Sequence, residues 1–256
     1  MKSFETFSQL HKNAAPLLLG NIWDVNSAKI FESKRYKAIG TSSQAVAKSL
    51  GYEDGEQMPF DLLVQLAKRV VEVVNIPFTV DMESGYNRSI AGIIENIEKL
   101  HDIGVVGINL EDTIADNPRQ LQPVETFQKT LSSITEHISR NNLKIFLNVR
   151  TDGFLLNIPT ALAETLTRIE RYEKAGANGI FVPCITKVND IKEVVNATSL
   201  PINVMCMPNL RGFDELQLLG VKRISMGPFV NAYVNKKVEE VADTILQNNN
   251  FSCLFN

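Results

Sequence analysis

A motif in which a helix end, a glycine and a short apolar run follow one another recurs three times, and it constrains the fold more than any other feature. The three copies cover residues 100–108, 172–180 and 216–224, with Gly104, Gly176 and Gly220 at the same place in each. Glycine adopts the left-handed conformation that ends many helices, and the apolar run after it is typical of a buried strand. The repeat therefore predicts joints at which a helix leads into a strand.

Short apolar runs occur at eight places, with helical periodicity between them. The runs cover residues 16–20, 37–42, 77–81, 105–111, 144–150, 179–183, 201–206 and 222–227, and the clearest helical segments are 60–74, 90–100, 162–172 and 234–246. Parallel strands are buried on both faces and need crossover helices. The pattern predicts an α/β protein with a single (β/α)8 barrel domain over residues 1–256. A doubly wound open sheet is the alternative, which the number of repeats disfavours.

Charge and composition restrict the kind of partner. With 26 Lys and Arg against 29 Asp and Glu, the formal net charge is -3, which argues against binding to nucleic acid or an anionic membrane by electrostatic attraction. No apolar stretch approaches the roughly 20 residues that span a bilayer. The three cysteines form no metal or redox motif and fit a reducing compartment. We therefore expect a cytoplasmic protein that binds a small molecule.

Polar residues at the strand ends are the candidates for chemistry, because barrel enzymes react substrates there. Asp81 and Glu83 are two residues apart at one strand end, so both side chains can point the same way. With Glu111 they form an oxygen-ligand set suited to Mg²⁺ that keeps most of its water. A single acidic residue at such a place more often caps a helix or faces solvent. Three of them near Arg150 favour a site.

Arg150 has two interpretations. Its planar guanidinium can bind a carboxylate or phosphonate through two parallel hydrogen bonds. Alternatively, it forms a structural ion pair with Asp152 or Glu111.

For other reactions of barrel enzymes, the sequence lacks the required residues at the expected positions. A Schiff-base aldolase needs a lysine near the far end of a strand, and the strand lysines here lie at strand beginnings: Lys37, Lys144 and Lys222. The histidines fall in helical or pre-strand segments, where core or surface roles are commoner than catalytic ones: His11, His101 and His137. Cys184 and Cys206 are expected to be inert core thiols.

Seven motifs resemble, in order, those of the isocitrate lyase/phosphoenolpyruvate mutase superfamily. They are GTSSQ at 40–44, LGYED at 50–54, VDMESGY at 80–86, GINLED at 107–112, NVRTD at 148–152, AGANGIF at 175–181 and RISMGP at 223–228. The resemblance implies a (β/α)8 barrel whose last helix is exchanged between subunits, usually in a homotetrameric dimer of dimers. It also implies Mg²⁺ and a 2-oxo acid or enolate bound at the strand ends.

The resemblance assigns roles to the acidic residues. Asp81 and Glu83 match the acidic pair around Mg²⁺, and Asp54 and Glu111 match neighbours that reach the ion through water. We expect Asp54, Glu111 and Arg150 to be the catalytic residues. Glu83 departs from the family pattern, because an aspartate that typically touches the metal occupies its position there.

The substrate-binding residues follow from the same resemblance. Ser42, Ser43 and Gln44 fall where the family binds the substrate carboxylate through backbone N–H and hydroxyl groups. Arg150 matches the arginine that grips carboxylate or phosphonate oxygens.

The loop at residues 113–122 departs most from the family. It lacks the cysteine of the isocitrate and methylisocitrate lyases and the Lys-Thr-Asn-Ser stretch of the phosphonate mutases, although Asn117 and Arg119 could orient a leaving group. Pro183 stands where mutases have histidine. The resemblance, together with Asn117 and Arg119, favours a Mg²⁺-dependent lyase that acts on a small 2-oxo or 2-hydroxy acid through an enolate, by carbon-carbon cleavage, decarboxylation or hydrolysis. A phosphonomutase and a non-catalytic 2-oxo acid binding protein are the alternatives.

Overall fold

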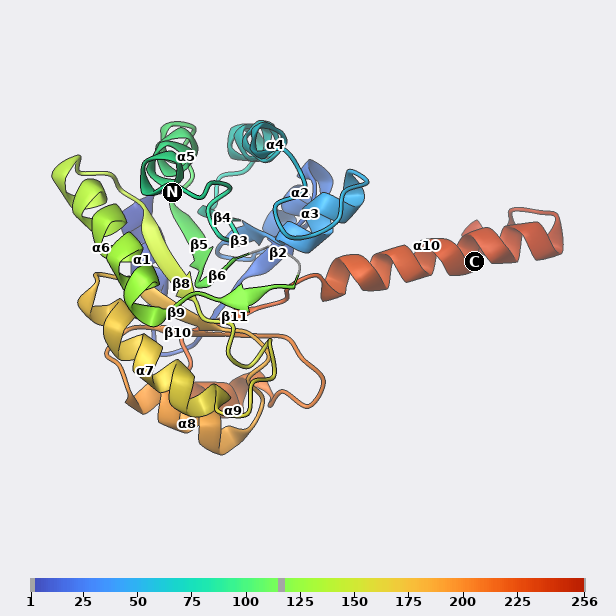
Figure 1. The fold of residues 1–256 in the computed structure, drawn as a ribbon. Helices are drawn as coiled ribbons and strands as arrows, with labels where there is room; N and C mark the ends of the chain where they lie inside the picture. Colours follow the sequence, from blue (N-terminus) through green and yellow to red (C-terminus); the bar gives the residue numbers. More distant parts are fainter. Residues whose placement is uncertain (1–2, 115–117, 256) are drawn as a thin grey trace.

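The computed structural model describes residues 3–114 and 118–255, in which parallel strands form a barrel surrounded by helices (Figure 1). The barrel strands are β1 (Leu17–Leu18), β2 (Gly20–Ile22), β3 (Ile39–Thr41), β4 (Phe78–Asp81), β5 (Gly107–Glu111), β8 (Phe146–Arg150), β9 (Gly179–Val182), β10 (Ile202–Met205) and β11 (Arg223–Ser225). The helices are α1 (Phe4–Leu10), α2 (Val25–Ser33), α3 (Ser43–Ser49), α4 (Phe60–Val73), α5 (Ile90–Asp102), α6 (Val124–Arg140), α7 (Ala161–Lys174), α8 (Val188–Asn196), α9 (Phe213–Leu218) and α10 (Phe229–Asn248), followed by a short 3₁₀ turn, η1 (Ser252–Leu254).

The first apolar run closes the barrel. It is divided at Leu19 into β1, which pairs with β11, and β2, which pairs with β3, and all the barrel pairings are parallel. The predicted (β/α)8 barrel is confirmed, and each of the eight runs contributes to it. The prediction that the first strand ends at residue 20 is wrong, because β2 continues to Ile22 along β3.

The predicted helix-to-strand joints are also confirmed. Gly104, Gly176 and Gly220 have φ of 96°, 93° and 90°, the left-handed region in which glycine carries no steric penalty. A helix ends just before each of these glycines, and the chain enters a buried strand after it. Outside the barrel, helices bury one face against the strands, as α4 does with Leu63 and Val70.

A small hairpin, β6 (Thr113–Ile114) paired antiparallel with β7 (Gln120–Leu121), follows β5. It belongs to the loop that the sequence marks as divergent. Asn117, which was predicted to orient a leaving group, lies outside the described residues.

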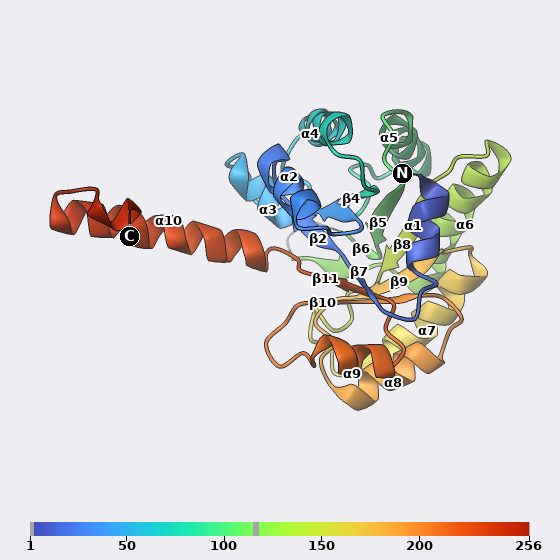
Figure 2. The same ribbon diagram turned by 180° about the vertical axis from the view of Figure 1, so that it is seen from behind.

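Helix α10 leaves the barrel and projects away from it, as the two opposite views show (Figures 1 and 2). Three of its large side chains, Tyr233, Val238 and Leu246, are 64%, 63% and 74% exposed. The expectation that this last helix is exchanged between subunits stays a prediction.

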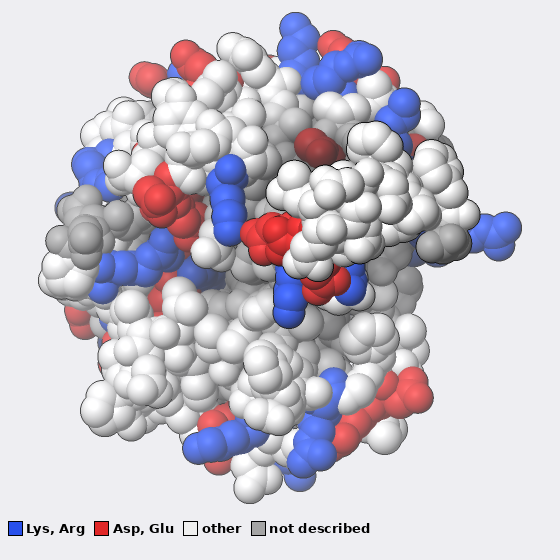
Figure 3. All heavy atoms as spheres, turned by 90° about the vertical axis from the view of Figure 1, so that its right-hand side faces the viewer, with Lys and Arg blue, Asp and Glu red and all other residues white. Residues whose placement is uncertain are grey.

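The surface carries charges of both signs. Viewed from the side on which α10 projects, acidic side chains lie among basic ones (Figure 3). Within residues 3–114 and 118–255, no helix is both long and apolar enough to cross a membrane. The cytoplasmic location stays a prediction.

Helix α1 covers the amino-terminal end of the barrel. Its Phe7 is fully buried, and the ring of His11 stacks on Phe146 with the centroids 4.4 Å apart. His11 Nδ1 donates to the Phe7 carbonyl at 2.9 Å, whereas Nε2 has no hydrogen-bond partner in the described part of the chain. Burial, together with the nearby charge of Arg223, lowers the pKa of His11 to about 3. His11 is therefore a neutral core histidine.

This burial predicts acid sensitivity. Below pH 6.5 the unfolded chain binds a proton at His11 that the folded protein does not bind until about pH 3. The His11 contribution to the free energy of unfolding is therefore complete above pH 6.5 and falls by up to about 1.4 kcal/mol per pH unit below it. Urea unfolding between pH 7.5 and 5 should show a more acid-sensitive wild type than His11→Phe. His101→Gln, on the partly exposed end of α5, should behave as the wild type, and equal slopes for all three proteins would contradict the assignment.

Candidate functional site

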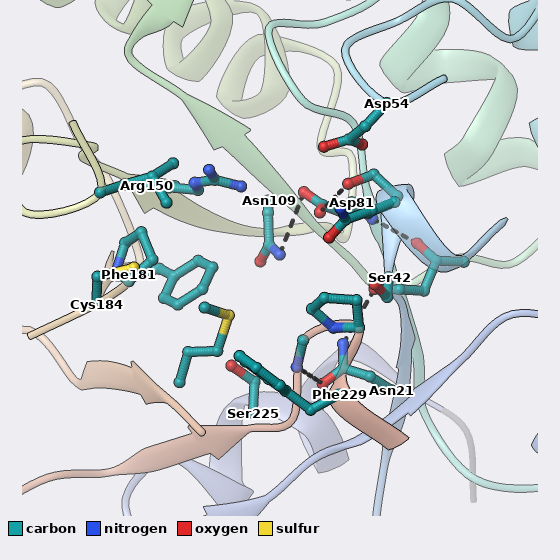
Figure 4. Close-up of a pocket in the computed structure, with 18 of the residues that line it drawn as sticks. Asn21, Ser42, Asp54, Asp81, Asn109, Arg150, Phe181, Cys184, Ser225 and Phe229 are labelled. Atoms are coloured by element: carbon teal, nitrogen blue, oxygen red, sulfur yellow. Dashed lines mark hydrogen bonds between the residues drawn. The ribbon is translucent and has the colours of Figure 1, made fainter. Parts of the chain in front are cut away.

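A cavity of about 390 Å³ opens where the barrel strands end (Figure 4). Six of the predicted catalytic, substrate-binding and metal residues line it: Ser42, Ser43, Gln44, Asp54, Asp81 and Arg150. Arg119, which was expected to orient a leaving group, also lines it. Glu83 and Glu111 are buried beside the cavity and do not line it. Further lining residues come from strands that carried no predicted site residue, among them Asn21, Met205 and Ser225.

Asp81 is held in place by the adjacent strands. Its backbone N–H donates to Thr41 Oγ1 at 2.8 Å, and Ser43 Oγ donates to Asp81 Oδ2 at 2.9 Å. Asn109 Nδ2 lies 3.5 Å from the other carboxylate oxygen. Because β3 and β5 both flank β4, the carboxylate is fixed from two sides at the edge of the cavity.

The barrel interior below Asp81 is polar. Asn148 donates to Asn109 at 2.9 Å and to Asn203 at 3.2 Å. Arg223 is 1% exposed, and its Nε and Nη1 have no hydrogen-bond partner among the residues described. Burial lowers the pKa of Arg223 to about 9. The cavity therefore has an amide floor with a buried arginine beneath it, which the sequence analysis did not anticipate.

The position of the Glu83 side chain does not follow from the alternation of side chains along β4. Strand β4 ends at Asp81, and Glu83 has a φ of 48°, so the alternation of side chains does not continue to it. Both of its carboxylate oxygens accept the Glu56 N–H at 3.1 Å, and Tyr86 OH donates to Oε1 at 3.1 Å. The Glu83 carboxylate is therefore held by Glu56 and Tyr86, and it does not line the cavity as Asp81 does.

Two arginines and two carboxylates form a buried ion cluster next to the cavity. Arg150 donates to Asp152 through Nε at 2.6 Å and Nη2 at 3.1 Å, and its Nη1 lies 3.1 Å from Glu111 Oε2. Arg119 Nη1 donates to Glu111 at 2.7 Å and to Asp152 at 3.3 Å. Arg150 thus forms the structural ion pairs and also lines the cavity, where its remaining Nη protons can serve a ligand.

Negative charge exceeds positive charge around the cavity. Five carboxylates, Asp54, Asp81, Glu83, Glu111 and Asp152, gather with the two arginines, Arg119 and Arg150. Burial, followed by repulsion from Asp54 and Glu111, raises the pKa of Glu83 to about 8. Burial and repulsion from Asp81 also raise the pKa of Asp54.

A hydrated divalent cation fits this surplus of carboxylates. The carboxylates of these residues would coordinate a metal ion through oxygen atoms, which are the ligands that Mg²⁺ prefers. Over residues 3–114 and 118–255, no three His, Cys, Asp or Glu side chains are close enough to hold an ion directly. Mg²⁺ usually keeps several waters and needs one or two direct carboxylates. Asp81, which lines the cavity, can supply a direct carboxylate, and Asp54, Glu83 and Glu111 can act through water.

Uncharged side chains form another part of the cavity lining, which the sequence analysis did not predict. They include Phe181, Met205 and Met207. Cys184, which was expected to be an inert core thiol, has a φ of 63° and also lines the cavity.

Cys206 is exposed, so its assignment to the core is wrong. It follows Met205, the last residue of β10, and its backbone N–H bonds to Ser225 while the side chain points outward.

Residues 7–246 match the family model described as phosphoenolpyruvate phosphomutase. The chain belongs to this family. An uncharacterized protein of Mycobacterium tuberculosis (strain CDC 1551 / Oshkosh) is 31% identical over 222 residues, which cover 87% of this chain and 81% of that protein. The oxaloacetate decarboxylase of Pseudomonas entomophila (strain L48) is 25% identical over 230 residues, 86% of this chain and 77% of the enzyme.

Solved structures of the phosphomutase family have the same fold. A candidate phosphonomutase from Burkholderia cenocepacia J2315 is 33% identical, with a TM-score of 0.89 over 95% of this chain and 100% of that one. The resemblance to the isocitrate lyase/phosphoenolpyruvate mutase superfamily is confirmed. Since members of this superfamily are lyases and mutases, the chain is an enzyme of this kind.

The ion cluster predicts a strong dependence of stability on Asp152. Asp152→Asn removes the carboxylate that accepts three hydrogen bonds from the two arginines. We expect the free energy of unfolding to fall by about 3 kcal/mol, at the lower end for a broken buried pair because the change also relieves repulsion from Glu111. Urea unfolding measures this loss. Asp102→Asn, on the exposed end of α5, is the control, and a similar small loss in both variants would contradict a structural role of the cluster.

Proposed function

We propose that the protein is a Mg²⁺-dependent lyase that acts on a small 2-oxo or 2-hydroxy carboxylic acid through an enolate, by carbon-carbon cleavage, decarboxylation or hydrolysis. The observation that carries the proposal is one cavity, at the strand ends, lined by Asp54, Asp81 and Arg150 together. The similarity to an oxaloacetate decarboxylase supports a 2-oxo acid as the substrate.

The acidic residues have defined roles in this proposal. Asp81 binds Mg²⁺ directly, and Glu83, Asp54 and Glu111 hold its water molecules. When bound, the ion supplies positive charge that stabilises the enolate oxygen. The hydrogen bonds that Asp81 receives from Ser43 and Asn109 keep its carboxylate oriented towards the cavity.

The substrate carboxylate is bound at the start of α3, on the same side of the cavity as Asp81. Ser42, Ser43 and Gln44 begin helix α3 directly after β3 and offer it hydroxyl and backbone N–H groups. Arg150 donates its remaining Nη protons to the substrate. Asp152 fixes the guanidinium plane through two hydrogen bonds, so this donor needs no reorganisation during the reaction.

Residues after β9 and on the loop after β5 bear on the two alternatives. A phosphonomutase is supported by the 33% identical candidate phosphonomutase, but Pro183 replaces the histidine that mutases have. A non-catalytic binding protein is favoured by the absence of a loop cysteine. Arg119 lies on this loop and lines the cavity, where it can orient a leaving group, which favours an enzyme.

The metal assignment is tested by oxalate, a stable analogue of the enolate of pyruvate. Calorimetric titration should detect oxalate binding with Mg²⁺ and lose it with a chelator. Asp81→Asn should weaken Mg²⁺-dependent binding by at least roughly 100-fold, and Glu83→Gln, acting through water, by about 10- to 100-fold.

The control for these variants is Asp102→Asn, which should bind oxalate as the wild type does. Undiminished Mg²⁺-dependent affinity in Asp81→Asn would refute the assignment. Turnover of oxaloacetate, 2-hydroxy acids and phosphonopyruvate, each with Mg²⁺, then distinguishes decarboxylase, lyase and mutase. Binding without turnover of any of them would favour the non-catalytic alternative.

The proposal includes a homo-oligomer, a dimer of dimers in which α10 packs on a partner subunit. The apolar side chains of α10 are exposed to water in the single chain, and a helix of this length gains stability mainly from packing an apolar face.

Sedimentation tests this assembly. The wild type should sediment as a tetramer of its 28.5 kDa chain, whereas the double variant Val238→Glu, Leu246→Glu should sediment as a smaller species because charges oppose burial of α10. Gln247→Glu adds a charge at a polar, exposed position of the same helix and should keep the wild-type mass. A monomeric wild type would rule out the exchange.

A further inference from the structure

The cavity has two chemically different sides. One side holds Asp54, Asp81 and the residues that begin α3, and Arg150 lies across from them, next to Phe181. The other side is formed by uncharged side chains: Leu155, Phe181, Pro183, Cys184, Met205 and Met207. In Figure 4, Phe181 and Cys184 lie across the cavity from Asp54 and Asp81. We refer to these six residues as the apolar wall.

None of the six side chains of the apolar wall carries a charge, and the cation next to them, Arg150, is already paired with Glu111 and Asp152. Among the described residues that line the cavity, the cations are Arg119 and Arg150, and both are bound to carboxylates of the ion cluster. Arg150 marks the border between the two sides, because its guanidinium lies 5.8 Å from the centroid of the Phe181 ring. A carboxylate placed against the wall would lose its hydration without gaining a partner. An alkyl group placed there would be removed from water favourably.

In the apolar wall, the place of Met205 is fixed by Gly227, whereas the methionine side chains themselves are flexible. Gly227 has a φ of 56°, and a Cβ at this position would come within 2.6 Å of Met205 Sδ, so the glycine leaves the space that the methionine occupies. Cys184 Sγ lies 3.9 Å from Met207 Sδ. Thioether side chains are flexible and polarizable, and they fit apolar groups of different shapes. The wall can therefore contact a short linear tail as well as a branched one.

The geometry points to a 2-oxo or 2-hydroxy acid whose chain beyond the reacting carbons is an alkyl tail, bound by the apolar wall, and not a further carboxylate. A carboxylate that leaves as CO₂ belongs to the reacting carbons and not to this tail. This inference rests on the proposed function, which assigns the acid group to the opposite side of the cavity. Met205 and Met207 are then residues that determine specificity, since they contact the tail and not the reacting atoms.

A matched series of 2-oxo acids tests the inference by binding alone. Calorimetric titrations of the Mg²⁺-loaded full-length protein would use oxalate, pyruvate, 2-oxobutyrate, 2-oxopentanoate and 2-oxoglutarate. From pyruvate to 2-oxopentanoate, the affinity should rise by roughly fourfold per methylene group. 2-Oxoglutarate has a carboxylate where 2-oxopentanoate has a methyl group, and it should bind at least tenfold more weakly.

The outcomes separate the two proposals. If oxalate and pyruvate bind but 2-oxoglutarate binds as tightly as 2-oxopentanoate, the apolar tail is refuted and the proposed function stands. If neither oxalate nor any 2-oxo acid binds, the proposed function fails and this inference fails with it.

A charge placed in the wall should reverse the preference. Met207→Lys supplies a cation and should raise the affinity for 2-oxoglutarate relative to 2-oxopentanoate at least tenfold, whereas Met207→Leu should keep the wild-type order. An unchanged ratio in a folded Met207→Lys protein, checked by its thermal unfolding, would contradict contact between Met207 and the tail. Should this variant not fold, the wild-type comparison of the two acids decides alone.

Discussion

The paired hydrogen bonds between Arg150 and Asp152 are the interaction on which the site depends. Strands β5 and β8 run side by side with Glu111 opposite Arg150, so the sheet register itself brings this carboxylate to the guanidinium. Arg119 reaches the same two carboxylates from the loop after β5. Buried charges are costly unless each one is paired. The cluster therefore joins two strands and a loop into a single unit at the edge of the cavity.

A second buried network connects this unit to the outer helices. Asp112 Oδ1 accepts the backbone N–H of Asp152, while its Oδ2 accepts hydrogen bonds from Arg168 and Tyr172 of α7. Burial raises the pKa of Asp112 to about 6, with Arg168 opposing the rise. Asp152 is thus fixed through its side chain by Arg150 and through its backbone by Asp112. Its position is set by packing beyond the cavity, as precise binding geometry requires.

The sequence predicted the fold well because its signals repeat. Apolar runs, glycine joints and polar strand ends each occur several times, and a barrel satisfies all of them. Six predicted residues line one cavity because a barrel brings the polar ends of its parallel strands together. The path of the chain at Glu83 could not be predicted, because β4 ends at Asp81 and the backbone then turns to a positive φ, so strand alternation does not extend to this residue.

Other parts of the site gave no signal that sequence reasoning could separate from the core. Met205 and Phe181 belong to buried strands, and an apolar residue that lines a cavity has the same sequence pattern as one that packs in the interior. Arg119 was named from the sequence as a residue that could orient a leaving group, but its pairing with Glu111 and Asp152 could not be predicted, because the path of a loop does not follow from local propensity. The buried Arg223 lies at the start of a strand, where polar residues more often face solvent.

The divided first strand makes closure of the barrel a late step, because β1 pairs with a strand near the other end of the barrel sequence. Leu17 in β1 pairs with Arg223 in β11, so the barrel closes only after nearly the whole chain has been synthesised. Contacts between such distant residues form slowly, because a large loop must be ordered first. Until then, β10 and the segment of β1 expose unpaired backbone groups, which are templates for pairing with other chains. The same strand that completes the native barrel therefore leaves the nascent one open to aggregation.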